Sequence, residues 1–328
     1  MKIAEYLRVD DPPHLWPLMR QCGVDHAVLR LPEAADGTMP SDLAAVRTAV
    51  ERVEKAGFAV EAIEPIPPME KVKQGLPGRD EEIEHVHHLL ATMERLGVQI
   101  LCYNFMAAFG WGRTRWAEPG RGEALVTGFD VDDLEALPAH DVALSEDRMW
   151  ANYEYFVRAV VPVAERHGIR LAMHPDDPPV SPYRGVARIM RTPEAIERAM
   201  SLSDSPAHGL TFCQGTFSTM GADIPATIRR FADRIRFVHF RDVRGTPDRF
   251  VETFHDEGQT DMRAAMAAYA EIGFDGPLRP DHVPTLFGEP HDRPGYEVLG
   301  RLYAVGYLRG LWEAVAHPTD LEGDRDDR

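Results

Sequence analysis

The sequence has only three cysteines, no long apolar run and no excess of basic residues. Cys22, Cys102 and Cys213 are too few and too scattered for the disulfide framework of a small secreted protein. No stretch approaches ~18 consecutive apolar residues, and the N-terminal MKIAEYLRVDDPP lacks the apolar core of a signal peptide. We therefore expect a cytoplasmic protein without membrane segments, in which any chemically important cysteine acts as a thiol or thiolate.

The charge balance is acidic. Lys and Arg number 36 against 53 Asp and Glu, which gives a formal net charge of −17. Non-specific binding to nucleic acid or to an anionic membrane rewards a basic surface, so we expect neither partner. Part of the acidity lies in the sequence DLEGDRDDR at the end of the chain, and we expect residues 318–328 to form a frayed, solvated tail.

The chain also lacks a low-complexity linker, and no Gly-rich phosphate-binding turn follows the first expected strand. Instead, short runs rich in β-branched residues alternate with longer amphipathic segments. The expected strands are Ile3–Leu7, His26–Leu31, Ala59–Ile63, Gln99–Asn104, Arg170–His174, Gly209–Cys213, Ile235–Phe240 and Gly276–Asp281. The expected helices are Pro13–Cys22, Ser41–Ala56, Arg79–Leu96, Glu146–His167, Thr192–Ser201, Asp223–Ala232, Asp261–Ile272 and Tyr296–Ala316. Eight such pairs predict a single α/β domain, a (β/α)8 TIM barrel over residues 1–317, rather than a doubly wound sheet.

One long stretch without clear periodicity follows the fourth expected strand. Residues 105–145 are rich in Gly, Pro, Trp and acidic residues. Loops of this length without secondary structure are uncommon in compact domains and are often functional. In a barrel this insertion would lie over the C-terminal mouth, so we expect it to act as a lid.

Each of the last four expected strands ends in a side chain of a metal-ligand type. The fifth ends at His174, the sixth at Cys213, the seventh one residue after His239, and the eighth at Asp281. The carboxyl ends of these strands converge on one half of the barrel mouth. The sequence therefore predicts a divalent-metal site formed by two histidines, a cysteine and an aspartate.

Taken singly, these residues have ordinary explanations. A histidine at a strand end is usually just hydrogen-bonded, and a buried cysteine usually behaves as a small hydrophobic residue. Their occurrence at four consecutive strand ends is what favours a metal site. The pattern alone leaves the metal open, because a cysteine with two histidines suits zinc, whereas a carboxylate and open positions suit Mn²⁺ or Fe²⁺.

Candidate acid, base and anion-binding residues surround this set. His282 directly follows Asp281, and Tyr296 opens the last amphipathic segment. Arg241 follows the seventh strand and is suited to holding a carboxylate through two hydrogen bonds. His255 lies in the next loop, within FVETFHDEGQTDM.

With these residues in view, the chain resembles the mannonate dehydratase family over nearly its whole length. The stretches that carry the resemblance are YNFM (103–106), MHPDDPP (173–179), GLTFC.G (209–215), FVHFRDV (237–243), F.E..H.EG..DM (250–262) and RPDH (279–282). The resemblance implies a TIM barrel of the xylose-isomerase-like group that binds Mn²⁺, with Fe²⁺ as an alternative. It also implies a metal held by His174, Cys213, His239 and Asp281.

The family reaction converts D-mannonate to 2-keto-3-deoxy-D-gluconate and water, so the resemblance implies a hydro-lyase that acts on a small sugar acid in hexuronate catabolism. It places proton transfer on His282 and Tyr296, without fixing which residue is the base. We expect substrate contacts from Arg241, Asn104 and His255. The family forms dimers or larger assemblies, which implies a homo-oligomer.

The sequence departs from the family pattern around the expected pocket. Gly110 and Gly112 stand where the family usually has Asp and Thr, and Val283–Pro284 replaces a Gly-Arg pair after RPDH. Loss of hydrogen-bonding groups alters discrimination between hydroxylated substrates, so a closely related aldonate is an alternative substrate. Two other functions remain open at this stage, namely a TIM-barrel sugar isomerase or epimerase and a non-catalytic sugar-acid-binding protein.

Overall fold

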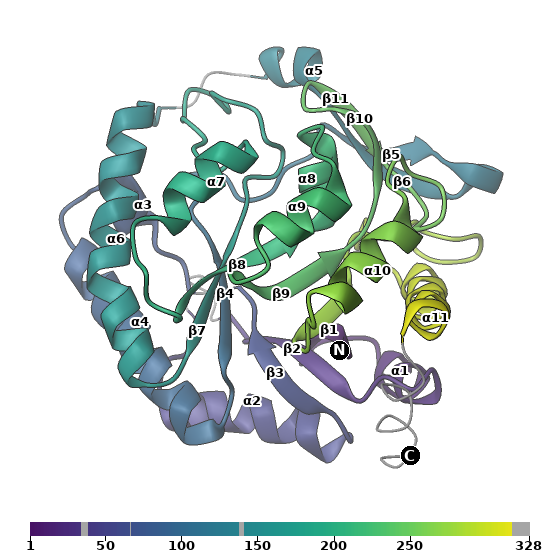
Figure 1. Cartoon of the computed structure of the whole chain (residues 1–328), viewed down its shortest axis with the longest axis horizontal. Helices are drawn as coiled ribbons and strands as arrows, with labels where there is room; N and C mark the ends of the chain where they lie inside the picture. The colour runs from purple at the N-terminus through teal and green to yellow at the C-terminus, as the bar shows by residue number, and fades with distance from the viewer. Residues whose placement is uncertain (34–38, 66, 138–140, 317–328) are drawn as a thin grey trace.

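The computed structural model describes residues 1–33, 39–65, 67–137 and 141–316, so the acidic tail expected over residues 318–328 lies outside the described residues. Eight parallel strands close into a barrel in the order β1-β12-β9-β8-β7-β4-β3-β2 (Figure 1). The barrel strands are β1 (Lys2–Arg8), β2 (His26–Arg30), β3 (Ala59–Ile63), β4 (Ile100–Asn104), β7 (Arg170–His174), β8 (His208–Cys213), β9 (Ile235–Phe240) and β12 (Pro277–Pro280). These are the eight strands that the sequence predicted, within two residues at most ends, and the TIM-barrel prediction is confirmed.

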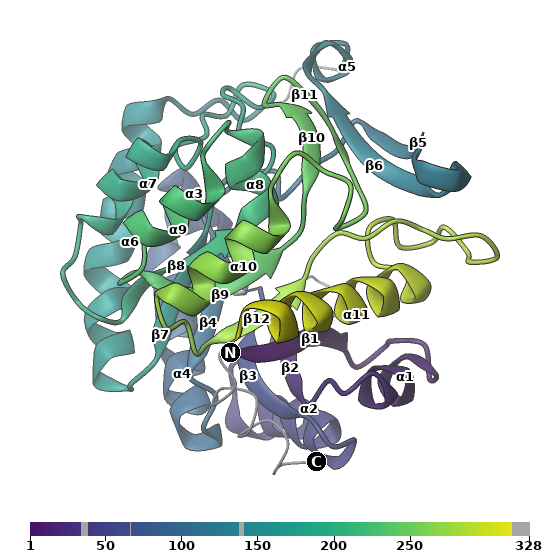
Figure 2. The same ribbon diagram turned by 45° about the vertical axis from the view of Figure 1, so that its right-hand side comes forward.

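Helices surround the barrel, with α4 and α6 side by side on one flank and α11 on another (Figures 1 and 2). The helices are α1 (Leu15–Gln21), α2 (Leu43–Lys55), α3 (Glu70–Gln74), α4 (Arg79–Leu96), α5 (Val131–Glu135), α6 (Glu146–Arg166), α7 (Pro193–Met200), α8 (Gln214–Thr219), α9 (Ile224–Arg230), α10 (Met262–Glu271) and α11 (Val298–Val315). Helix α4 ends at Gly97, whose φ of +74° is accessible to glycine at little cost. None of the described helices is both long and apolar enough to cross a membrane.

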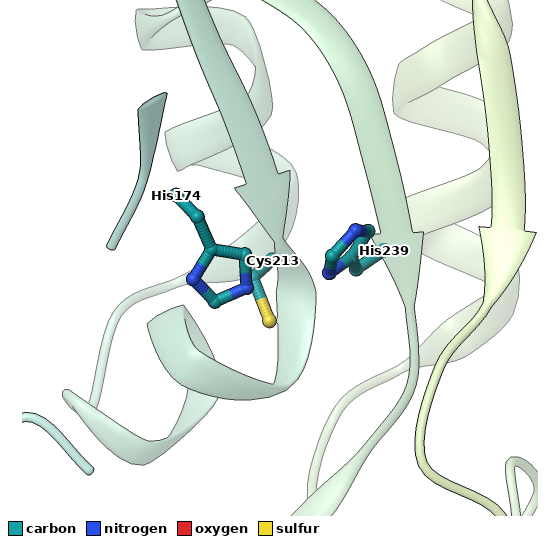
Figure 3. A group of neighbouring side chains, drawn as sticks. All are labelled: His174, Cys213 and His239. Carbon is teal, nitrogen blue, oxygen red and sulfur yellow. The ribbon is translucent and has the colours of Figure 1, made fainter. Parts of the chain in front are cut away.

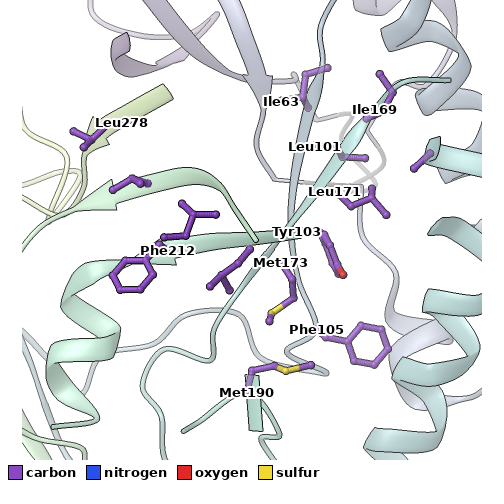
Figure 4. Close-up of a cluster of buried hydrophobic side chains, with 14 of the residues drawn as sticks. Ile63, Leu101, Tyr103, Phe105, Ile169, Leu171, Met173, Met190, Phe212 and Leu278 are labelled. Atoms are coloured by element: carbon purple, nitrogen blue, oxygen red, sulfur yellow. The ribbon is translucent and has the colours of Figure 1, made fainter. Parts of the chain in front are cut away.

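Side-chain alternation along the strands divides the core into two parts. Outward residues such as Leu101, Leu171 and Met173 pack against the helices in one large cluster (Figure 4). Inward residues form a smaller cluster inside the barrel: Ala4, Tyr6, Val28, Ala62, Ile100, Cys102, Ala172 and Phe237. Because successive side chains on a strand point to opposite faces, the same alternation decides which residues reach the barrel mouth.

The insertion over residues 105–145 contains regular structure that the sequence analysis missed. Its described part holds β5 (Arg115–Pro119), the short 3₁₀ helix η1 (Arg121–Glu123), β6 (Leu125–Asp130) and helix α5. Strands β5 and β6 join the hairpin of β10 (Val243–Thr246) and β11 (Arg249–Glu252) in an antiparallel sheet of order β10-β11-β6-β5. Figure 2 shows β5 and β6 projecting from the barrel. Strands β5 and β6 are short and lack strong apolar alternation. Besides pairing with each other, they join the sheet through the pairing of β6 with β11, which lies more than a hundred residues later in the sequence.

Candidate active site and metal centre

Alternation along the barrel strands brings a layer of polar side chains to the carboxyl-terminal mouth. The inward-facing series continues from Ala172 to His174 in β7 and from Phe237 to His239 in β9. Most of this layer lines a cavity of about 250 Å³. Its polar strand-end members are Tyr6, Arg30, Glu64, Asn104, His174, His239, Arg279 and Asp281. The cavity is near the lower end of small-molecule sites, which begin at ~300 Å³, and therefore suits a small substrate.

Three of the four predicted metal ligands lie together. His174, Cys213 and His239 each present one ligand atom, and these atoms all lie within 4.8 Å of one another. Figure 3 shows the two imidazole rings on either side of the Cys213 sulfur, each carried by the end of a neighbouring barrel strand. Cys213 and His239 are buried, and His174 is partly buried.

The surroundings of these three residues fit a bound metal. His174 Nδ1 lies 2.6 Å from the carbonyl oxygen of Pro175, so Nδ1–H donates there and Nε2 is left as the ligand nitrogen. The Thr216 hydroxyl donates to Cys213 Sγ at 3.1 Å, as it would to a thiolate. Both ring nitrogens of His239 are buried without a hydrogen bond, although Nε2 lies 3.1 Å from Glu64 Oε1 as a potential ion pair. A metal ion would satisfy such a nitrogen.

Asp281, the fourth predicted ligand, lies at the edge of this group. Its Oδ2 is 3.6 Å from His239 Nδ1 and 4.0 Å from Cys213 Sγ. The same oxygen accepts a 2.9 Å hydrogen bond from Arg241 Nε, and Oδ1 accepts one of 3.0 Å from Arg279. Burial acts to raise the pKa of Asp281, but the surrounding basic side chains, His282 and then Arg279, hold that pKa well below its usual range. Asp281 is therefore a carboxylate close enough to complete the ligand set.

The two candidate proton-transfer residues line the same cavity. The Tyr296 hydroxyl donates to Asp281 Oδ1 at 3.3 Å, and the His282 and Tyr296 rings meet edge to face with centroids 5.4 Å apart. Trp111, from the insertion, covers the His282 ring at 4.5 Å. Burial, followed by the charge of Asp281, raises the pKa of Tyr296 well above its usual value, so the phenol is a proton donor in this structure.

Of the three residues that we expected to contact substrate, one lines the cavity and two do not. Asn104 lines the cavity, and its side-chain oxygen accepts the Met106 backbone N–H at 3.2 Å, which leaves the amide NH₂ group for a ligand. Arg241 does not line the cavity; it is fully buried and paired with Asp281, Glu252 and Asp177. His255 is also fully buried outside the cavity, with Nε2 2.8 Å from the Phe240 carbonyl oxygen. The expectation that these two residues touch substrate is corrected by their burial.

Several cavity residues were missed by the sequence analysis. Arg30 is the last residue of β2, Glu64 directly follows the last residue of β3, and Arg279 lies in β12. They could have been found by applying to all eight strands the strand-end rule that was applied only to the last four. Arg113, a buried residue of the insertion that does not line the cavity, had no comparable signal, because its partners Asp177 and Glu252 are distant in the sequence.

The closed eight-stranded barrel is a TIM barrel. The cluster of two histidines and a cysteine lies at the carboxyl-terminal end of its strands, where TIM-barrel enzymes have their active sites, and is a candidate metal-dependent active site. A family model described as D-mannonate dehydratase (UxuA) matches residues 16–143 and 139–321. Mannonate dehydratase 2 of Halalkalibacterium halodurans is 37% identical over 294 residues, which cover 80% of this chain and 85% of the relative. The mannonate dehydratase of Shouchella clausii is 35% identical over 311 residues, covering 84% of this chain and 85% of that protein.

The solved structures agree with this relationship. The crystal structure of mannonate dehydratase from Streptococcus suis serotype 2 aligns with a TM-score of 0.90 and 31% sequence identity, over 96% of this chain and 94% of that chain. The chain belongs to the D-mannonate dehydratase family, whose members are hydro-lyases. An L-ribulose 3-epimerase aligns with a TM-score of 0.63 at 15% identity, a likeness that shows the fold alone.

Proposed function

We propose that this protein removes water from D-mannonate to give 2-keto-3-deoxy-D-gluconate. Family membership supports the reaction, and one observation carries its assignment to this site. His174, His239, His282 and Tyr296 line one small cavity at the barrel mouth, and the Cys213 sulfur lies within 4.8 Å of ligand nitrogens of His174 and His239. This arrangement offers a metal ligand set, a base and an acid within reach of one substrate molecule.

We propose that the resident cofactor is a divalent cation, Mn²⁺ with Fe²⁺ as an alternative, held by His174, Cys213, His239 and Asp281. The buried carboxylate of Asp281 and the buried His239 nitrogens, which make no hydrogen bond, support this ligand set. When bound, such a cation supplies Lewis-acid stabilisation of the negative charge that develops on the substrate carboxylate. The chain itself supplies the two proton transfers.

We assign the base to His282 and the acid to Tyr296. His282 Nδ1 is directed to Glu252 Oε1 at 2.9 Å, so Nε2 is the nitrogen that can accept the C2 proton of the substrate. The Tyr296 hydroxyl already acts as a donor, toward Asp281, and would protonate the departing C3 hydroxyl. Breaking the C2–H and C3–O bonds gives an enol and water, and the enol becomes the 2-keto product when C3 takes a proton.

Arg30 and Asn104 are the proposed contacts to the rest of the substrate. Arg30 lines the cavity with its side chain 25% exposed, and its NH1 group donates to the Tyr6 hydroxyl at 3.2 Å. The insertion contributes Trp111 to the wall, which supports a role for residues 105–145 as a cover that excludes water.

The altered glycines support a closely related aldonate as the alternative substrate. At Gly112 an added Cβ would lie 2.4 Å from the Tyr183 hydroxyl, so a side chain there would require Tyr183 to shift. At Gly110, which lines the cavity, an added Cβ would meet nothing within 4 Å. A hydrogen-bonding side chain is therefore missing where the wall has room for one.

The test is a dehydration screen with purified protein loaded with Mn²⁺ or Fe²⁺. D-mannonate and a panel of other aldonates and uronates are supplied, and formation of a 2-keto-3-deoxy acid is measured. Turnover of D-mannonate supports the proposal, and turnover of a different aldonate alone keeps the reaction and changes the substrate. An isomerised sugar without loss of water would favour an isomerase or epimerase. Metal binding without turnover of any acid would favour a non-catalytic sugar-acid-binding protein.

The same family relationship supports a cytoplasmic enzyme that forms a homo-oligomer. Cys22, Cys102 and Cys213 are all free thiols, as a reducing compartment would keep them. Light scattering of the purified protein measures the assembly, and a monomer would contradict this part of the proposal.

A further inference from the structure

A buried ion-pair cluster lies beside the cavity, and of its four members only Asp177 lines the cavity wall. Arg113 donates to both carboxylate oxygens of Asp177, at 2.7 and 3.0 Å, and its NH2 group also contacts Glu252 Oε1. Arg241 NH1 lies 3.0 and 2.9 Å from the two oxygens of Glu252, and its NH2 group donates to Asp177 at 2.7 Å. The four side chains are at most 3% exposed.

Glu252 has one contact that Asp177 does not have. Its Oε1 lies 2.9 Å from Nδ1 of His282, and Glu252 itself does not line the cavity. Glu252 ends strand β11, which is bonded on one side to β10 and on the other to β6 of the insertion. Two arginines and the pairing of β11 in the sheet therefore hold the Glu252 carboxylate in place, and this carboxylate contacts His282.

We propose that Glu252 is a positioning residue that holds His282 in one orientation and one tautomer, with Nδ1–H donating to Glu252 and Nε2 directed to the cavity. The tautomer of a histidine is set by the hydrogen bond of its other ring nitrogen. A carboxylate on Nδ1 leaves Nε2 as the only nitrogen able to take a proton from substrate. Trp111 fixes the plane of the ring from one side at 4.5 Å, so rotation away from Glu252 is also hindered.

The cluster itself contains a competing arrangement. Arg113 NH2 lies 3.4 Å from the same His282 Nδ1, and a guanidinium would donate to an unprotonated nitrogen. The carboxylate is 0.5 Å closer, and Arg113 NH2 has two carboxylate partners in better positions. Glu252 also remains ionised, because Arg241 and Arg113 outweigh the effect of burial and lower its pKa to about 2. These contacts favour an Nδ1–H group over an unprotonated Nδ1.

The first experiment measures the tautomer and does not depend on turnover. ¹⁵N-histidine-labelled protein is loaded with diamagnetic Zn²⁺, which the same donor set accepts, and the His282 signals are assigned by their absence in His282→Asn. We expect the neutral His282 ring to carry its proton on Nδ1 and not on Nε2. A wild-type His282 with the proton on Nε2 overturns the proposal, whether or not any Glu252 variant folds.

The second experiment is a double-mutant cycle and rests on the proposed function. Glu252→Gln is expected to lower kcat by ~10–100-fold, with KM changed less than about twofold. In a His282→Asn background the same substitution should lower kcat no further, because its effect acts through the histidine. Equal kcat losses in both backgrounds would mean that Glu252 only neutralises the arginines. Melting temperature and metal content are measured for every variant.

Asp177→Asn is the matched control, since Asp177 binds the same two arginines without bonding to His282. Its effect on kcat should be the same in the wild-type and His282→Asn backgrounds. The two experiments also separate the two proposals. An Nδ1–H tautomer in a protein that dehydrates no acid sugar leaves the positioning of His282 intact and rejects the proposed function, whereas an active wild type with an Nε2–H tautomer does the reverse.

Discussion

Arg241 Nε donates a 2.9 Å hydrogen bond to Oδ2 of Asp281, an oxygen that lies 3.6 Å from His239 Nδ1 in the His174–Cys213–His239 cluster. The arginine that the sequence suggested for the substrate carboxylate therefore holds a protein carboxylate instead. Its other guanidinium nitrogens are taken by Glu252 and Asp177. Arg241 thus holds Asp281 from the side away from the cavity, while Tyr296, which lines the cavity, contacts the other carboxylate oxygen.

Replacing Arg241 with Lys should reduce stability more than it affects substrate binding. A lysine cannot serve three carboxylates in a fixed geometry, and a broken buried ion pair costs ~3–5 kcal/mol. Chemical denaturation of Arg241→Lys measures the change in the free energy of unfolding. Arg229→Lys, at an exposed pair with Glu271, is the control and should change it by less than about 1 kcal/mol. A stable Arg241→Lys variant with only a higher KM would contradict this interpretation.

Metal content should depend on Cys213 and not on Cys102. Glu64, Cys102 and His239 form a second group with ligand atoms within 4.8 Å, so His239 is shared between two candidate sites. Glu64, however, is paired with Arg279 at 3.1 Å through both oxygens, and burial raises the pKa of Cys102 well above its usual value. We expect Cys213→Ala to lose most bound metal, measured by elemental analysis after dialysis. Cys102→Ala should retain it, and the opposite result would move the site.

Arg30→Gln should raise KM by about tenfold or more with a smaller change in kcat. Hydrogen bonds to charged groups contribute ~1.5–3 kcal/mol, and Arg30 is placed to bind substrate away from the proton-transfer residues. Steady-state kinetics with the substrate found in the screen measures the effect. Arg8→Gln is the control, because Arg8 is paired with Asp10 and lies outside this cavity. An unchanged KM for Arg30→Gln would remove Arg30 from the site.

His255 should make the protein less stable as the pH falls below 6.5. Burial lowers the pKa of His255 from 6.5 to about 4 in the folded chain. Between pH 4 and pH 6.5 the histidine is protonated in the unfolded chain and unprotonated in the folded chain. The free energy of unfolding therefore rises with pH across this range and falls on acidification. Going from pH 7 to pH 5 should cost about 2 kcal/mol through this group.

The measurement compares the pH dependence of unfolding for wild type, His255→Gln and His14→Gln, all in chelator so that metal loss does not contribute. His255→Gln should show a shallower slope, and the exposed His14→Gln should match wild type. Equal slopes for all three proteins would show that His255 is not the group responsible.

The barrel could be predicted because each of its elements carries a local signal. Strands such as Arg170–His174 are short apolar runs, and the adjoining helices have a 3.6-residue period and recognisable ends. The sheet formed by β5, β6, β10 and β11 could not be predicted, because its central pairing joins Phe129 to Phe250 across the sequence. Such a pairing is decided by tertiary contacts and not by propensity.

The site was predictable to the same extent. His174, Cys213 and His239 were found because strand ends converge in a barrel, and that rule requires no knowledge of side-chain contacts. The burial of Arg241 was not predictable, because it depends on carboxylates supplied by three other segments. Arg113 and the contact between Glu252 and His282 were not predictable for the same reason, since both depend on neighbours that only the fold brings together.

The most direct test of the proposed chemistry follows D-mannonate in D₂O with metal-loaded wild type, His282→Asn and Tyr296→Phe. We expect the wild-type protein to form 2-keto-3-deoxy-D-gluconate with deuterium at C3, detected by mass spectrometry and NMR. Tyr296→Phe should still exchange the C2 proton but eliminate water slowly, whereas His282→Asn should be much slower than wild type in both steps. Retention of C2 exchange in His282→Asn and its loss in Tyr296→Phe would contradict the assignment of base and acid. Recovery of unchanged D-mannonate from wild type would contradict the proposed reaction itself.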